Sequence, residues 1–596
     1  DLIFDKLMVF TLTLIPAWVI LKSWLKQRKF NYIDKSQLNE SFIPEEIIEK
    51  EDKQENPLNE LAVHKNYKIM LYGLLVVSIL SISEYSSKNN YSSLALEVSR
   101  SEALALADTY LNNDNIILDD SWSVLSKFYS GKIDEEDRFI WKEMGQETYD
   151  DLMGSYLDNN LWNIRYVKFS GDVNDRTEEY SVLINPDGTL NQIRHKIPEN
   201  REGDSVSENV ARTIALEHIS NQFNLTTAEI EEISFEPSDL PNRKDWMFIF
   251  SDKSKLLDSG DLRIKINIAA DEVVSSSRFI YIPEEWERDD KNNMTTLGLI
   301  RIICSFTFIF LIIYAVASSV AKWSKGSFNI NLFKKIFLFL ALFGIVDIVN
   351  SYPLLVSDFS SAQPFINQIA TNLISSLLYS LIFSFMLSAI FSSISTNKPK
   401  TIHRFTHFEI VCISLIVIGF TSRAFNISNM TPIWISGMDV VNSYLPFLKN
   451  LTDTIFSYFN QVIIMLFVVN LMDRTKYFSK KKRGLIVILS SAVFAFLFLG
   501  THLGGDTAIN SVGVWIFGSF WILMIFASLY LNQFIYNMAM IPLVISIITG
   551  FNLLAAANSN AYPGILIGNV ICSLIIIIIG YCMYLTLLNL NQEGNE

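Results

Sequence analysis

Apolar residues occur in long runs along this chain, and short polar segments separate the runs. A hydrocarbon core about 30 Å thick needs about 20 apolar residues in a helix. Runs of roughly that length lie at residues 7–25, 68–84, 297–319, 335–352, 366–392, 408–425, 453–473, 484–502, 511–531, 534–556 and 564–586. The pattern predicts a polytopic α-helical membrane protein with about 11 transmembrane helices. Because no small-residue cleavage site follows the first run, we expect it to be an anchor and not a removed signal peptide.

One polar stretch, residues 86–296, separates the second run from the third and contains an internal repeat. Each copy begins with an amphipathic helix, predicted over Ser101–Leu111 and over Ser207–Ile219. A serine at the start and an acid in the first turn favour helix initiation in both. Strand-like runs of alternating character follow, at Leu161–Phe169 and Glu179–Lys196 in the first copy and at Asp245–Phe250 and Leu262–Phe279 in the second.

The two copies are in register with each other. Trp162 and Trp246 are 84 residues apart, Pro198 and Pro283 are 85 residues apart, and both copies end on Ile-Pro-Glu. Each copy is expected to be one helix against a curved antiparallel sheet, which resembles the PepSY or cystatin-like modules, usually binding or inhibitory elements. The expected domains are two spans with a cytoplasmic loop (1–85), a first repeat (86–200), a second repeat (201–296) and a bundle of about nine spans (297–596).

The positions of Lys and Arg predict how the chain crosses the membrane. Basic residues cluster after the first, third, fifth and seventh runs, whereas the segments 351–365, 503–510 and 557–563 carry none. Because Lys and Arg favour cytoplasmic loops, the alternation puts the N-terminus and the insert outside the cytoplasm and the C-terminus inside. We therefore expect a multi-pass protein of a bacterial cell membrane with an extracytoplasmic α+β insert.

Composition and charge narrow the possible functions. The formal net charge is −14 and the acids crowd the insert, which argues against nucleic-acid binding because that requires a contiguous basic face. The four cysteines all lie in apolar runs, so we expect no disulfide framework and no thiol metal site. His195 and His218 are isolated, which predicts a solvated acidic surface without a catalytic cluster. We expect no cofactor, and as partners membrane lipid and a protein or peptide at the insert.

Three short motifs in the predicted bundle carry polar residues that belong together in a known family. Arg474 follows the seventh run, His502 ends Phe498-Leu-Gly-Thr-His502, and Asn552 ends Ile548-Thr-Gly-Phe-Asn552. With the duplicated insert before them, they are similar to a group within the CPBP intramembrane proteases, the CAAX-processing and bacteriocin-processing endopeptidases. The motifs of that family are Glu-Glu-x-x-x-Arg, Phe-x-x-x-His and His-x-x-x-Asn, on three membrane helices.

This chain departs from the family pattern at the residues that carry the reaction. Val469 and Asn470 stand at the two glutamate positions, and Ile548 stands at the second histidine position. The family reaction needs a carboxylate to activate water, and the only acid near the first motif, Asp473, would point to a different helical face. The resemblance therefore implies a catalytically degenerate relative without a metal site. Its degenerate site positions are His502, Asn552, Arg474, Asn470 and Asp473.

The sequence thus favours a non-catalytic CPBP-like membrane protein whose outer repeats bind a peptide, an envelope component or a partner protein. Two alternatives stay open. An active intramembrane endopeptidase would need a substitute acid, such as Asp473 or Asp347, close to His502. A membrane transporter would need interrupted helices around a polar site at the midplane.

Other polar residues within the predicted spans are candidate sites. Asp347 is either functional, as acids in membranes often are, or placed near the outer interface. A stripe of residues four apart, Asn372 to Ser388, is typical of close helix packing, with a polar conduit as the alternative. His403 and His407 have a usable metal-ligand spacing, but Arg404 stands where zincins have the catalytic glutamate.

Overall fold

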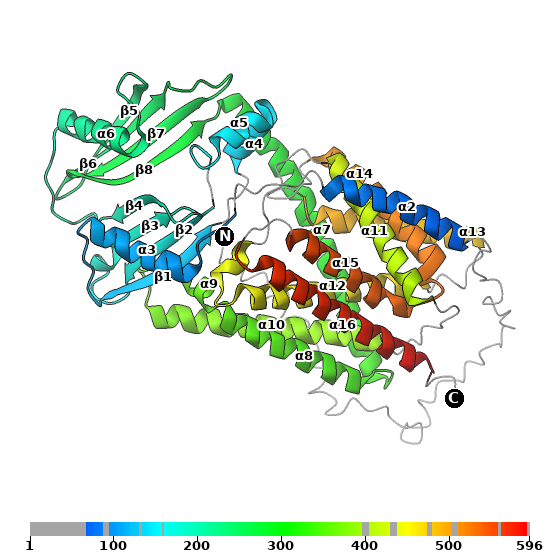
Figure 1. Ribbon diagram of the computed structural model, residues 1–596. Helices are drawn as coiled ribbons and strands as arrows, with labels where there is room; N and C mark the ends of the chain where they lie inside the picture. The colour runs from blue at the N-terminus through cyan, green and yellow to red at the C-terminus, as the bar shows by residue number, and fades with distance from the viewer. Residues whose placement is uncertain are drawn as a thin grey trace, which may run out of the picture.

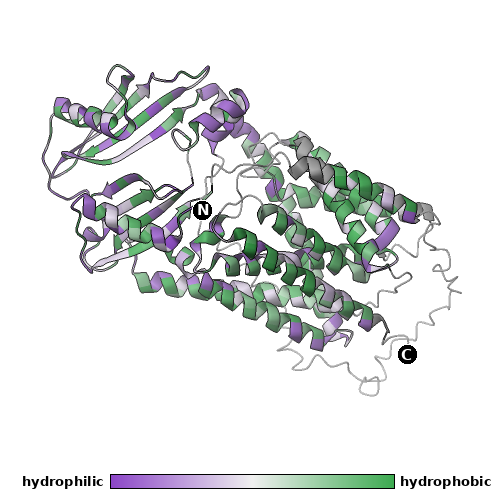
Figure 2. Ribbon diagram, in the orientation of Figure 1, coloured by the Kyte–Doolittle hydropathy of each residue, from purple (hydrophilic) through white to green (hydrophobic). Residues whose placement is uncertain are grey.

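The computed structural model describes residues 67–86, 95–129, 134–157, 160–395, 405–428, 438–473, 480–503, 511–557 and 562–592. Within these residues a bundle of helices carries the insert at one end (Figure 1). The bundle helices are largely hydrophobic, whereas the strands and helices of the insert mix polar and apolar residues (Figure 2). The first predicted span, residues 7–25, lies outside the described residues.

Helices account for all of the bundle's main elements. They are α2 (Tyr67–Ser86), α7 (Glu284–Ser324), α8 (Ile330–Asn350), α9 (Tyr352–Ser357), α10 (Phe365–Ser395), α11 (His407–Ser428), α12 (Pro446–Asp473), α13 (Lys480–Gly500), α14 (Val512–Leu529), α15 (Ile541–Ala557) and α16 (Ile565–Gln592), with short turns at Met438–Asn442, Tyr530–Phe534 and Met538–Met540. Six described helices are long and apolar enough to cross a membrane, and three shorter apolar stretches lie in α2, α11 and α13. The chain is therefore a membrane-embedded protein, while the number of 11 spans stays a prediction.

The insert contains two four-stranded antiparallel sheets, each with one helix on one side. The first repeat has α3 (Arg100–Asn113), β1 (Trp122–Tyr129), β2 (Leu161–Lys168), β3 (Glu179–Ile184) and β4 (Leu190–Lys196), and the second has α6 (Glu208–Phe223), β5 (Ile230–Asp239), β6 (Lys244–Asp252), β7 (Asp261–Ala269) and β8 (Glu272–Tyr281). Neighbouring strands in each sheet follow one another in the sequence. One helix against an antiparallel sheet is the predicted arrangement, although the sequence prediction did not include β1 and β5.

The same hydrogen bond closes both repeats. The indole N–H of Trp162 donates to the carbonyl of Val98 over 3.0 Å, and that of Trp246 donates to the carbonyl of Val206 over 3.2 Å. Each carbonyl directly precedes the serine at the N-cap of the repeat's helix. In the first copy this serine is Ser99, so the predicted start at Ser101 was two residues late. Each indole therefore ties the start of the helix to the sheet below it.

The first repeat contains an insertion that the sequence prediction missed. The helix starts Ser99 and Ser207 are 108 residues apart, but the tryptophans are only 84 residues apart, so the first copy has a net 24 additional residues between its helix start and its tryptophan. The addition lies in the connection between β1 and β2. It forms α4 (Glu135–Glu143) and α5 (Gly145–Leu152). These two helices pack on the second repeat and on α7, and not on their own sheet.

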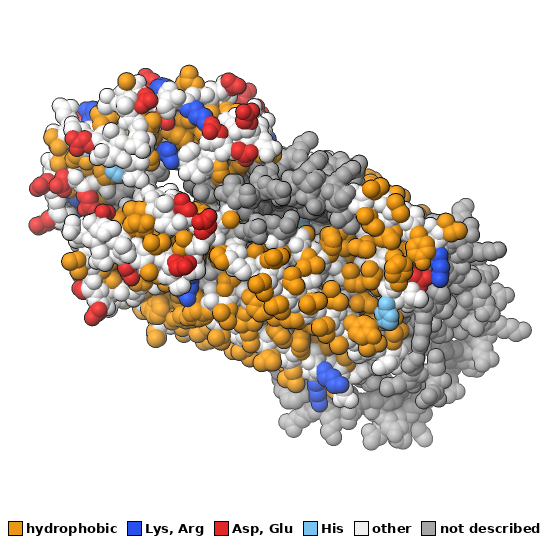
Figure 3. All heavy atoms as spheres, in the orientation of Figure 1, with side chains coloured by type: hydrophobic (Ala, Val, Ile, Leu, Met, Phe, Trp, Pro, Cys, Tyr) orange, Lys and Arg blue, Asp and Glu red, His pale blue; other side chains and the backbone are white. Residues whose placement is uncertain are grey.

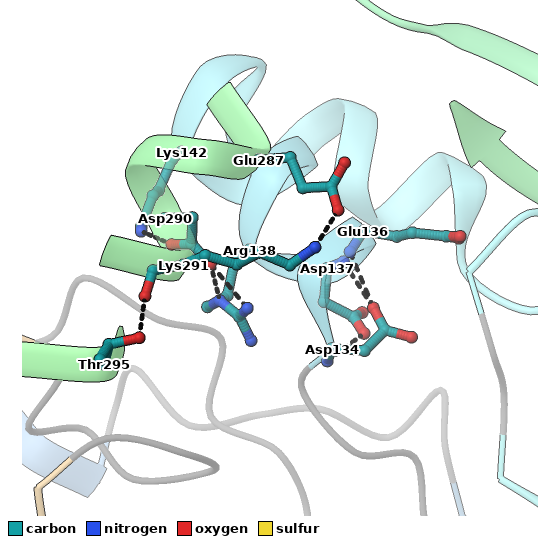
Figure 4. Close-up of polar contacts among 9 residues, drawn as sticks. All are labelled: Asp134, Glu136, Asp137, Arg138, Lys142, Glu287, Asp290, Lys291 and Thr295. Atoms are coloured by element: carbon teal, nitrogen blue, oxygen red, sulfur yellow. Dashed lines mark hydrogen bonds and ion pairs between the residues drawn. The ribbon is translucent and has the colours of Figure 1, made fainter. Parts of the chain in front are cut away.

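Helix α7 connects the second repeat to the membrane without a break. It begins at Glu284, directly after Ile-Pro, and continues for 41 residues, a length of about 62 Å that is twice the hydrocarbon thickness. The expected domain boundary at residue 296 therefore lies inside one helix. Near its start, Asp290 accepts hydrogen bonds from Arg138 (2.7 and 2.9 Å) and Lys142 (3.1 Å) of α4 (Figure 4).

We expect the variant Asp290→Asn to loosen α4 and α5 from α7. Arg138 and Asp290 are both nearly buried, and removing one partner of a buried ion pair costs about 3–5 kcal/mol. Hydrogen exchange of residues 284–296, followed by mass spectrometry, should increase. Glu287→Gln is the matched control, because Glu287 pairs with Lys291 on the exposed side of the same helix, where such a pair contributes about 1 kcal/mol or less. Equal effects of both variants would contradict this account.

Candidate functional site

The degenerate motif positions do not converge on one site in the described residues. His502 follows the end of α13 and is exposed, with its Nδ1 3.0 Å from the carbonyl oxygen of Phe498. Asn470 and Asp473 lie at the end of α12 that leads into the start of α13. Helix α13 has 21 residues and so carries the chain about 30 Å from there to His502. A general base must lie within about 3 Å of the proton it removes.

The other two motif positions lie elsewhere. Asn552 is on α15, with an exposed side chain. Helix α15 packs mainly on α16, α11 and α12, whereas α13 packs mainly on α14 and α7. Arg474 lies outside the described residues. His502 and Asn552 thus lie beside or on helices whose main neighbours differ, α13 and α15.

Asp347 belongs to an ion cluster that the sequence prediction did not reveal. Lys449 of α12 lies 3.0 Å and 3.2 Å from the two carboxylate oxygens of Asp347 and 2.8 Å from Asp453. The hydroxyl of Thr452 donates to Asp347 over 2.6 Å. An acid that is paired and hydrogen-bonded is far less costly in a membrane. Asp347 therefore helps to join α8 to α12, and its partners on α12 are about 100 residues away in the sequence.

The polar stripe on α10 lies where two helices approach closely. A Cβ atom placed on Gly344 of α8 would be 1.8 Å from the hydroxyl of Ser380, so the glycine lets α8 and α10 approach closely at this point. Ser384 and Ser388 are fully buried. Small residues at such contacts are typical of helix packing in membranes, and the structure supports that interpretation of the stripe.

The histidine pair lies at the start of α11, where other residues cap the helix. Thr406 and Glu409 form a capping box, in which the Thr406 N–H donates to Glu409 over 2.7 Å and the Glu409 N–H donates to the Thr406 hydroxyl over 3.2 Å. His407 lies against the rings of Tyr581 and Tyr584. The other histidine, His403, lies outside the described residues.

The first sheet rests with its open face on the bundle. We call the open face the side of a sheet that faces away from its helix. In the first repeat, Leu125 and Val167 on this face pack against Val356 and Phe359, at and just after α9. Arg165 donates to the carbonyls of Ser357 (2.9 Å) and Phe359 (3.3 Å). The open face thus holds a short segment through apolar contacts and main-chain carbonyls.

Two charged residues complete this contact. Glu179 holds the Arg165 guanidinium through two hydrogen bonds of 2.6 Å and 2.9 Å, a geometry that fixes the side chain in one orientation. Lys127 contacts both carboxylate oxygens of Asp358, at 2.6 Å and 2.8 Å. The segment at residues 355–359 is therefore recognised by its apolar side chains, its carbonyls and its one carboxylate.

The edge of the first sheet is bound as well. The side chain of Asn442, which is fully buried, accepts a hydrogen bond from the Phe128 N–H (2.6 Å) and donates one to the Phe128 carbonyl (3.1 Å). The amide thereby satisfies both main-chain groups that an edge strand leaves unpaired at this residue. This pairing attaches β1 to the bundle.

Among the described residues, the second repeat makes neither of these attachments to the bundle. Trp162 pairs with Phe128 in the first sheet, and Trp246 pairs with Pro237 in the second, so Pro237 occupies the position of Phe128. Proline has no N–H to donate, and a side chain like that of Asn442 could not bind there in the same way. In the part of the chain that the structure describes, the apolar clusters that join insert and bundle include no residue of the second open face.

His195 is not isolated, which corrects the prediction from the sequence. Its Nδ1 lies 2.7 Å from Glu272 of the second repeat and its Nε2 lies 3.2 Å from Glu178 of the first. The imidazole ring stacks on Tyr180 at 4.0 Å. Edge strands β4 and β8 meet here, so His195 is a link between the two repeats. Its partners are distant in sequence, and spacing alone could not reveal them.

The surface divides into two chemical zones. On the face drawn in Figure 3, acidic side chains gather on the insert, hydrophobic side chains cover the bundle, and the basic residues of the bundle lie at the end away from the insert. The segments without Lys or Arg, represented by Phe359 and Tyr562, contact the first repeat. These two segments therefore lie at the end of the bundle that carries the insert.

Comparison with known proteins identifies no relative. The chain matches no family model, no curated protein and no solved structure. The CPBP and PepSY resemblances accordingly stay predictions from the motifs quoted above.

We expect the stability of the α4–α5 segment to fall as pH rises from about 4 to about 8. Burial, and then the charge of Asp134, raise the pKa of Asp137 to about 8. Between these pH values the folded protein keeps a proton that the unfolded chain has released, so raising the pH favours unfolding. Opening free energies from hydrogen exchange of residues 135–152, corrected for intrinsic rates, should decrease between pH 5 and pH 8. In Asp137→Asn the decrease should disappear, and an unchanged decrease would contradict the assignment.

Proposed function

We propose that this chain is a catalytically degenerate CPBP-like membrane protein that binds a protein or peptide partner through the open face of its second repeat. The observation that carries the proposal is the contrast between the two repeats. The first repeat uses its open face and edge to hold the bundle, whereas the equivalent face of the second consists of partly exposed residues such as Met247, Ile249 and Lys265.

The first repeat offers an internal example of how such a face recognises a segment. Its open face holds residues 355–359 through two apolar side chains, main-chain carbonyls and the carboxylate of Asp358. The repeats have the same strand order, and their two central strands pair in the same register, so the second face has the same strand framework and different chemistry. This supports a partner segment of similar size and different charge pattern.

The side chains of the second face define the chemistry of that partner. Met247 and Ile249 offer apolar contact in the centre of the sheet, and Lys265 lies beside Ile249 on β7. On the same face Arg263 stacks on Tyr281, with its guanidinium carbon 3.8 Å from the ring centre. We infer a segment with one or two large apolar side chains and a carboxylate near Lys265. A contact between Lys265 and such a carboxylate would contribute most to the binding free energy if both groups are shielded from water.

Addition of a strand at the edge is less consistent with this sheet. Pro237 removes a donor from the exposed edge of β5, and the pairing register shifts between Glu232 and Ser234. Proline and bulges are features by which proteins prevent edge pairing. The proposed contact therefore uses the face of the sheet and not its edge.

The membrane region then serves to anchor and orient the repeats. With the predicted topology, the insert faces the outside and the C-terminus faces the cytoplasm, in a cell membrane. The substituted motif positions and the distance between Asp473 and His502 along α13 favour this role over an active peptidase. The ion cluster at Lys449 holds α8 and α12 together, and we infer a structural role for it in preference to transport.

Partner recognition can be tested with the full chain in lipid nanodiscs and a displayed library of random peptides. We expect enriched peptides that combine an acidic residue with large apolar residues. Lys265→Glu should weaken their binding by about tenfold or more, because a carboxylate would then face a like charge (a 1.4 kcal/mol change is tenfold). Lys196→Glu, an exposed reversal on β4, should leave binding unchanged. No enrichment, or equal loss in both variants, would count against the open face.

The degenerate character can be tested separately. Incubated with transmembrane peptides carrying a fluorophore and a quencher, the purified chain should give no cleavage above a blank, because Val469 and Asn470 stand at the two glutamate positions and neither side chain can activate water. His502→Ala should behave like the wild type. Turnover by the wild type that is lost in His502→Ala would restore the peptidase interpretation.

A further inference from the structure

The two repeats of the insert touch at places that differ in chemistry. One contact is apolar: Phe139 and Tyr149 of the α4–α5 segment pack with Leu262 and Ile280 of the second repeat. Another is polar and lies where the edge strands β4 and β8 run side by side (Figure 1). We call this second contact the seam. Its centre is the imidazole ring of His195, so the chemistry of that ring decides how firmly the seam is held.

The imidazole of His195 lies between two carboxylates. Its Nδ1 is 2.7 Å from Glu272 on β8, and its Nε2 is 3.2 Å from Glu178, directly before β3. The histidine is only 6% exposed, and its ring stacks on Tyr180. An ionised carboxylate only accepts hydrogen bonds, and a neutral imidazole has one donor nitrogen and one acceptor nitrogen. Only the doubly protonated ring can therefore donate to both carboxylates.

The two carboxylates differ in their other partners. Glu178 also contacts Lys168 (3.1 Å) and Arg201, so it keeps two cations beside it when the ring is neutral. The side chain of Glu272 is 50% exposed, and among the described residues its hydrogen-bond partner is His195 alone. Burial and then the charges of Glu178 and Glu272 raise the pKa of Tyr180, which keeps the phenol neutral. The bond between the repeats thus depends on the charge of the imidazole.

Neutralisation of the ring weakens the seam in either tautomer. With the remaining proton on Nε2, the lone pair of Nδ1 faces the carboxylate of Glu272. With the proton on Nδ1, that hydrogen bond remains but loses the attraction between opposite charges. Hydrogen bonds between charged groups exceed neutral ones by an amount that corresponds to about a tenfold change in an equilibrium. A hydrogen bond from the side chain of Gln222 to the carbonyl of Asn191 (2.8 Å) also joins the repeats and does not depend on pH.

We propose that the seam between β4 and β8 is a pH-dependent joint, closed while His195 is charged and open once that charge is lost. An ordinary imidazole makes this change between about pH 5 and pH 8. Asn442 holds the first sheet on the bundle, whereas the second repeat stays attached through the α4–α5 segment and α7. Opening therefore redirects the open face of the second repeat without unfolding either copy. The joint needs no ligand, so its test is independent of the partner proposed above.

The joint can be measured in the full chain in lipid nanodiscs, as the distance between two spin labels. Ala105→Cys on α3 and Glu217→Cys on α6 place one label at an exposed site of each repeat, and Cys582→Ser removes the exposed native cysteine. Double electron–electron resonance should show one main distance at pH 5. At pH 8 a second distance should appear, with its population relative to the first raised by about tenfold.

Two variants separate the joint from other titrating groups. Glu272→Gln should keep the closed distance at both pH values, because a carboxamide accepts a hydrogen bond from the charged ring and donates one to the neutral ring. His195→Ala should show the second distance at both. Asp137 of α4, whose pKa is raised by burial to about 8, is unchanged in these variants. A pH response that persists in Glu272→Gln would overturn the assignment to His195, and so would identical distances in the wild type at pH 5 and pH 8.

Discussion

The position of the insert depends on the pairing between Asn442 and Phe128. An edge strand exposes main-chain donors and acceptors that need partners when they are buried, and a single carboxamide satisfies both groups of Phe128. Around this point the apolar contacts of Leu125 and Val167 and the hydrogen bonds of Arg165 hold the same sheet on the bundle. Val440, Val441 and Tyr562 of the bundle join the core of the same repeat, so the first repeat is held on the bundle at several points.

The duplication shows how one fold separates two roles. Both repeats use the same tryptophan-to-carbonyl hydrogen bond to hold the helix on the sheet. Their cores are therefore closed by the same contact. Their exteriors differ at equivalent positions, with Phe128 in one copy and Pro237 in the other. A backbone N–H that serves docking in the first repeat is absent from the second. The first repeat therefore attaches the insert to the bundle, and the open face of the second repeat is not used for this attachment in the described residues.

The parts of this structure that follow local patterns could be predicted from the sequence. The lengths of the apolar runs located the bundle helices. The separation of Trp162 and Trp246, which nearly equals that of Pro198 and Pro283, revealed the repeat. Contacts between distant residues could not be predicted. Asn442 is 314 residues from Phe128, and His195 is 77 residues from Glu272. The α4–α5 insertion was missed because its polar pattern resembles a loop and its buried face belongs to the other repeat.

A single helix connects the second repeat to the membrane bundle. Helix α7 leaves the second repeat at Glu284, passes Asp290 where α4 is bound, and packs on α10 and α13 in the bundle. It contains no proline over its 41 residues, and sharp kinks in helices are mostly caused by proline or by similar local interruptions. The second repeat is therefore joined to α10 and α13 by one continuous helix. The bundle needs no catalytic residues for such a connection, which relies only on an unbroken backbone and on the ion pairs at its outer end.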